Sequence, residues 1–118
     1  MSASTNTLIL EVAIRPDGVS DPVDLSALKR GGYELAALEL PAEWEGGDLT
    51  FLGSVEVGDA LRRVVDADGE PVAVTASPGA HTSLVGLVRD SLLPLAAVAV
   101  ASDATSEEWC RLVVRRES

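Results

Sequence analysis

The segment TLILEVAIR, residues Thr7–Arg15, alternates apolar and polar side chains and sets the pattern for the whole chain. Four alternate positions share one predicted face: Leu8, Leu10, Val12 and Ile14. A period of two is typical of a β-strand with one buried face. Pro16-Asp17-Gly18 follows and predicts a turn, because Pro fixes φ and Gly accepts a positive φ.

Short β-type segments separated by turn residues continue to the end of the chain. The Ala- and Leu-rich segment Tyr33–Leu40 also suits a helix, but its short span between Gly31-Gly32 and Pro41 favours a strand. The further predicted strands are Pro22–Leu25, Leu49–Val57, Leu61–Val65, Pro71–Ala76, His81–Gly86, Leu95–Val100 and Trp109–Arg116.

Three of these segments carry predictions about burial. In Leu49–Val57, alternation places Leu49, Phe51 and Val55 on one face. Leu95–Val100 lacks polar alternation, which predicts a central strand covered on both faces. In Trp109–Arg116 the inward positions are predicted to be Cys110, Leu112 and Val114, with Arg111 and Arg115 outward.

The sequence predicts only two short helical segments. Ser26–Arg30 predicts one helical turn, and Val88–Leu93 predicts a turn or a short helical corner before Pro94. Asp66-Ala67-Asp68-Gly69 between two strands predicts a hairpin with a type I′ turn. The expected fold is an all-β, single-domain, antiparallel β-sandwich, jelly-roll-like, with about eight or nine short strands. It occupies residues 7–118, behind a flexible N-terminal arm at residues 1–6.

Composition and charge narrow the class of protein. The chain has 118 residues, 47% of them hydrophobic but only 3% aromatic. Its core must therefore be mainly aliphatic, with a few large members: Trp44, Trp109, Phe51 and Tyr33. A formal net charge of −10 argues against nucleic-acid binding, which needs clustered cations. The N-terminus lacks the pattern of a signal peptide, and the apolar run at 92–101 is too short to cross a bilayer.

The segment LPAEWEGGDLTF, Leu40–Phe51, holds the candidate interaction residues Glu43, Trp44 and Glu45. Glycoside hydrolysis needs two carboxyl groups on opposite sides of a substrate bond, and neighbouring glutamates on one loop do not supply that geometry. Trp44 is interpreted as a lid packed over one end of the sandwich, with a sugar-stacking platform as the alternative.

No other motif predicts an enzyme or a cofactor. His81 and Cys110 are single residues of their types, too few for a zinc site, and Cys110 is expected to be buried and inert. The Asp66–Gly69 segment lacks the later ligands of a calcium loop. The serines lie in no nucleophile elbow. The sequence therefore predicts a non-enzymatic protein without metal or cofactor.

From Val23 onward the chain resembles a family of small proteins encoded in the structural gene clusters of tailed bacteriophages and prophages. The resemblance is carried by Leu40-Pro41-Ala42-x-Trp44, by Leu49-Thr50-Phe51, and by a hairpin with Asp66, Gly69, Val72 and Val74. It departs from the family at Ala60-Leu61-Arg62-Arg63, where an aromatic-rich segment is common.

The resemblance implies a virion structural protein assembled in the host cytoplasm. The expected role is a capsid decoration or cement protein on the outside of the head shell, where residues 1–6 would become ordered. Expected partners are the major capsid protein or other virion proteins, together with further copies of the chain; neither nucleic acid nor a membrane is expected. The alternatives are a tail or neck component and a glycan-binding module that recognises a host surface through the loops around Trp44.

Overall fold

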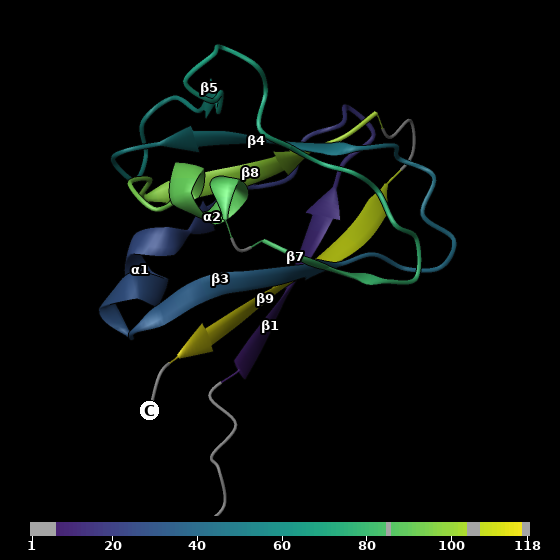
Figure 1. The fold of residues 1–118 in the computed structure, drawn as a ribbon, viewed down its shortest axis with the longest axis horizontal. Helices are drawn as coiled ribbons and strands as arrows, with labels where there is room; N and C mark the ends of the chain where they lie inside the picture. The colour runs from purple at the N-terminus through teal and green to yellow at the C-terminus, as the bar shows by residue number, and fades with distance from the viewer. Residues whose placement is uncertain (1–6, 85, 104–106, 117–118) are drawn as a thin grey trace, which may run out of the picture.

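Antiparallel strand pairs are the main regular structure of the chain in the computed structural model, which describes residues 7–84, 86–103 and 107–116 (Figure 1). The predicted arm at 1–6 and residues 117–118 of the predicted domain lie outside these ranges. In chain order the elements are β1 (Thr7–Ile14), β2 (Val23–Asp24), α1 (Leu25–Arg30), β3 (Tyr33–Glu39), β4 (Leu49–Ser54), β5 (Arg62–Arg63), β6 (Ala73–Val74), β7 (His81–Ser83), α2 (Leu87–Leu92), β8 (Ala97–Ala101) and β9 (Glu108–Arg116).

The strands pair in nested order. β1 pairs with β9, β2 with β8, β3 with β7, and β4 with both β5 and β6. The first half of the chain thus runs antiparallel to the second half as one long ribbon. Two further pairings, β3 with β9 and β4 with β8, wind this ribbon into two layers. This is the winding of a jelly roll, so the predicted all-β sandwich is confirmed.

The two layers are sheets of different order. We name the first the β1 sheet, with strand order β1-β9-β3-β7, and the second the β4 sheet, with order β2-β8-β4-β5 and β6 also on β4. Figure 1 shows the β1 sheet below, the β4 sheet above, and both short helices at one end. The β1–β9 register is unbroken from Thr7–Arg115 to Ile14–Glu108, whereas the β3–β9 register shifts between Leu35 and Ala37.

The core lies between the two sheets and is mainly aliphatic. Among the described residues, its only buried aromatic side chains are those of Phe51 and Trp44. Tyr33 is partly buried and packs against the core. β8 is buried from Ala97 to Val100, as expected for a central strand, and it lies between β2 and β4. The inward positions predicted on β9 are confirmed as buried: Cys110, Leu112 and Val114.

The turn at Asp66–Gly69 differs from the predicted type I′. That type needs a positive φ at two successive residues, but here only Gly69 has one, at +82°. The amide of Gly69 donates to the Asp66 carbonyl at 3.0 Å, and the amide of Asp66 donates to the Glu70 carbonyl at 2.8 Å. These two bonds define a three-residue loop that closes on a left-handed glycine. The Asp66 carboxylate accepts the amides of Asp68 and Glu70, which favours this form.

Two burial predictions at strand ends are wrong. Val55 was expected on the same face as Phe51, but β4 ends at Ser54 and Val55 is 67% exposed. Leu8 was expected inside, but it is 42% exposed. It lies at the start of β1, and Figure 1 shows that this end of the strand extends away from the β4 sheet. Alternation predicts which face a residue takes but not how far the opposite sheet extends.

Phe51 provides a test of the core. Replacing it with alanine leaves a large cavity between the sheets, so Phe51→Ala should lower the free energy of unfolding by about 3–5 kcal/mol. Val55→Ala, at the residue directly after the end of β4, should change it by less than about 0.5 kcal/mol because Val55 is exposed. Urea unfolding followed by circular dichroism measures both; equal losses would contradict the observed end of β4.

Candidate functional site

A surface hollow of about 680 Å³ lies at the end of the β1 sheet where β1 finishes and β9 begins. We name it the Trp109 hollow. Its lining residues are Glu11, Glu39, Pro41, Glu43, Trp44, Glu107, Glu108, Trp109, Cys110 and Arg111. They come from β1, β3, β9, the residue before β9 and the loop that follows β3. The jelly-roll winding thus brings together segments that are far apart in sequence.

Trp109 is the exposed aromatic side chain of the hollow, at 49%. It lies opposite Ala13 of β1 on the outer face of the sheet, since its neighbour Cys110 points into the core. The small side chain of Ala13 leaves the indole uncovered. A half-exposed tryptophan beside a concave surface is a usual anchor for a partner or ligand.

Charged side chains form one row across the sheet beside Trp109. Arg111 of β9 lies between Glu11 of β1 at 3.7 Å and Glu39 of β3 at 3.3 Å. Nε2 of His81, on β7, lies 3.2 Å from the Glu39 carboxylate. These pairs are solvated and contribute little to stability individually. Together they place the Arg111 guanidinium and the two carboxylates in one row on the same face as Trp109.

The hollow as a whole is acidic. Its lining contains five glutamates and one arginine. One of these glutamates, Glu108, is held at the base: its Oε1 accepts the amide of Glu45 at 2.9 Å, while its Oε2 is buried and has no hydrogen-bond partner among the described residues. A surface of this charge disfavours phosphate or nucleic acid and favours a cationic or neutral polyhydroxyl group.

The structure separates the three interaction candidates predicted from sequence. Trp44 is only 6% exposed and belongs to the core, as the lid interpretation expected. Its indole Nε1 donates to the Gly47 carbonyl at 2.9 Å, so both its ring and its polar atom are occupied within the protein. Glu43 is exposed and lines the hollow, and Glu45 is exposed but does not line it. A role for these residues in binding stays a prediction.

Sequence reasoning missed the residues that dominate the hollow. Trp109 was expected among the few large side chains of the core, which is wrong because it lies on the outward face of β9 and is 49% exposed. Glu11 and Arg111 were assigned only to outward faces, and Glu39 was assigned to no face. The signal was present, because alternation along 109–116 puts Trp109 and Arg111 on the same outward face. What the sequence lacked was the pairing of β9 with both β1 and β3, which places Glu11 and Glu39 on either side of Arg111.

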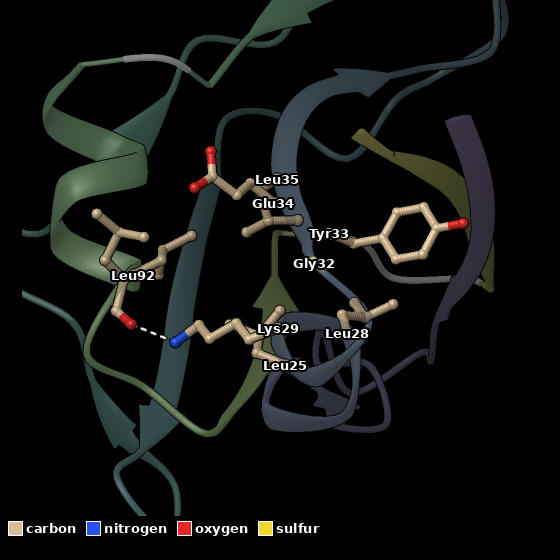
Figure 2. A pocket seen from close by; sticks show the side chains of 9 residues that line it. Leu25, Leu28, Lys29, Gly32, Tyr33, Glu34, Leu35 and Leu92 are labelled. Atoms are coloured by element: carbon tan, nitrogen blue, oxygen red, sulfur yellow. Dashed lines mark hydrogen bonds between the residues drawn. The ribbon is translucent and has the colours of Figure 1, made fainter. Parts of the chain in front are cut away.

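A second cavity, of about 240 Å³, lies between α1, β3 and α2 (Figure 2). Its walls are mostly leucine side chains and Tyr33. In Figure 2, Lys29 reaches from α1 toward the end of α2, where its ammonium donates to the carbonyls of Leu93 and Leu95. The cation therefore binds the backbone of the segment that follows α2. We assign this cavity a structural role as the joint between the two helices.

Fold and hollow together define a jelly-roll β-sandwich with an acidic surface site built around one exposed tryptophan. No protein-family model, curated protein or solved structure matches the chain. Within the described residues there is no group of three or more metal-ligating side chains, and neither short helix has the length and hydropathy needed to span a membrane.

The Gly46→Ala substitution tests the packing of the Trp44 loop. A Cβ there would come within 2.5 Å of Glu108 Oε2 and 2.7 Å of Trp44 Cζ2, so Gly46→Ala must displace the Trp44 loop. We expect a loss of about 1–3 kcal/mol in unfolding free energy. We also expect a red shift of Trp44 emission, measured in a Trp109→Phe background. Val57→Ala, at an exposed position, is the control and should leave both the unfolding free energy and the emission nearly unchanged.

Cys110 is expected to resist thiol reagents in the folded protein. Burial raises the pKa of its thiol from 9.0 to about 12, so the reactive thiolate is absent at neutral pH. Iodoacetamide at pH 8 should modify Cys110 only after denaturation, as followed by mass spectrometry. Because the folded pKa exceeds the unfolded one, this thiol also makes stability fall as pH rises from about 9 to about 12. Rapid labelling of the native protein would contradict its burial.

Proposed function

We propose that this chain is a non-enzymatic structural protein of a tailed-bacteriophage virion, acting as a decoration or cement protein on the outside of the head shell. The proposal starts from the sequence resemblance at 40–51 and 66–74. It is supported by the Trp109 hollow, which offers one aromatic anchor and a row of paired charges for a protein partner. The partner would be the major capsid protein, presenting a basic or apolar side chain to the indole.

The physical basis of decoration is repetition. A small interface with one aromatic anchor gives modest affinity for a single contact. On a symmetric shell, copies that also contact one another bind with a higher effective affinity without any deeper pocket. The net charge of −10 would steer such a protein toward a basic shell surface and away from other acidic molecules.

A non-enzymatic role agrees with the chemistry of the described residues. Cys110 is buried with a raised pKa, and so is a poor nucleophile. Glu43 and Glu45 lie on one short loop, so their carboxylates do not face each other across a cleft. The backbone amide of Glu45 donates to the Glu108 carboxylate. The arrangement resembles a contact surface more than a catalytic pair.

The second candidate is a glycan-binding module, and the observation that favours it is also Trp109. An exposed indole beside carboxylates and a guanidinium can stack on a sugar ring and bind its hydroxyl groups. Relative to the sequence prediction, the stacking residue would change from the buried Trp44 to Trp109. A tail or neck component remains a third possibility, with the same fold in another ring of the virion.

Co-sedimentation with expanded empty head shells tests the proposal. The wild-type protein should sediment with the shells to a saturating stoichiometry comparable with the number of shell subunits. Trp109→Ala should weaken binding by about 30-fold or more, the loss typical of a central aromatic anchor. Val57→Ala, at an exposed position away from the hollow, is the matched control and should bind as the wild type does.

Three results distinguish the candidates. Shell binding that free sugars do not inhibit supports decoration. Binding on a glycan array that is lost in Trp109→Ala, without any shell binding, supports the module. Sedimentation with purified tails but not with heads supports the tail or neck component. Failure to bind shells at any concentration tested overturns the primary proposal.

A further inference from the structure

β1 is an edge strand that is hydrogen-bonded on one side. Over all of Thr7–Ile14 it pairs with β9. On its other side, among the described residues, the single contact is a bridge between Ile14 and Ser20 at its last residue. The remaining length of β1 therefore presents a row of backbone groups that no other described strand pairs with.

This edge carries few of the features that protect edges from pairing. Its register with β9 has no bulge, its sequence TLILEVAI contains no proline, and Glu11 is its one charged residue. Leu8 and Ile9 are 42% and 56% exposed, the first toward the core side and the second toward the outer face. A long, regular and apolar edge of this kind is a template for a further strand.

The direction of the free backbone groups follows from one hydrogen bond. The amide of Arg15 donates to the Val19 carbonyl at 3.3 Å, on the side of β1 away from β9. Backbone groups of alternate residues point to the same side of a strand. The amides and carbonyls of Thr7, Ile9 and Glu11 are therefore directed outward, available to a neighbouring strand.

We propose that β1 pairs antiparallel with β1 of a second copy of this chain, with Ile9 opposite Ile9 of that copy. Both residues direct their backbone groups outward, so this register makes a closely hydrogen-bonded pair. It sets Leu8 opposite Leu10 and covers the exposed leucine. It also sets Glu11 opposite Thr7, which keeps the two glutamates of the dimer apart.

Charge and apolar rows continue across the proposed junction. Thr7 pairs with Arg115 of β9, and in the proposed register Glu11 of the second copy pairs with Thr7 on its other side. The glutamate and the arginine would then lie in the same cross-strand row, with Thr7 between them. Ile9 lies beside Val113, and Val113 lies beside Ala37, which forms an apolar row on the outer face. Pairing at Ile9 extends this row into the second copy. These complementary rows select a second copy over an unrelated extended peptide, and the inference does not depend on the shell-binding proposal.

Disulfide trapping tests the register. In Ile9→Cys, the two new cysteines would lie about 5.5 Å apart between Cα atoms, within the range of a disulfide. Mild oxidation should give a covalent dimer within minutes. Val113→Cys, one strand inward, is the matched control, because its two cysteines would lie about 14 Å apart, three strand spacings, and should not form a dimer. The native Cys110 is buried and should not compete.

Sedimentation velocity tests the association without cysteine chemistry. The wild-type protein should shift from monomer to dimer as its concentration rises. Ile9→Lys, which places two like charges at the centre, should weaken the dimer by about tenfold or more. Val57→Lys, an equally exposed site elsewhere, should not. Circular dichroism checks that both variants fold. A monomer at every concentration, equal effects of the two lysines, or equal crosslinking of the two cysteine variants would overturn the proposal.

Discussion

The pairing of β9 between β1 and β3 is the interaction on which the rest of the structure depends. The last described strand occupies an interior position in the β1 sheet, so the two ends of the ribbon meet there. Its inward side chains enter the core and its outward side chains form the middle of the Trp109 hollow. Core and surface site therefore share one strand, and a disturbance of β9 affects both.

The two tryptophans show how the fold places one side chain of this type in the core and the other on the surface. Trp44 follows Pro41 on a loop that folds back over the core, and its Nε1 is satisfied by Gly47. Trp109 lies on a regular strand opposite Ala13, where about half of its surface stays exposed. Gly46 and Glu108 connect the two environments, since the carboxylate that anchors the Trp44 loop belongs to the residue before Trp109.

Local pattern was sufficient to predict most of the strands and the burial of β8 and β9, because alternation and turn chemistry act over a few residues. It did not predict the exposure of Val55 or Leu8, which depends on where the opposite sheet ends. Nor did it predict the Asp66 turn, where the aspartate side chain accepts two backbone amides and favours one loop over another. The hollow escaped prediction for the same reason, since its residues meet only through long-range pairing.

The interior position of β9 also has a consequence for how the chain folds. Until Glu108–Arg116 has been synthesised, β1 and β3 have no strand between them, and their apolar faces stay open. Pairings between residues this distant in sequence form slowly, because a large loop must close first. The β1 sheet should thus form only after β9 has been synthesised and has paired with β1 and β3. Truncation or stalled synthesis before β9 should yield aggregation-prone species rather than a smaller folded core.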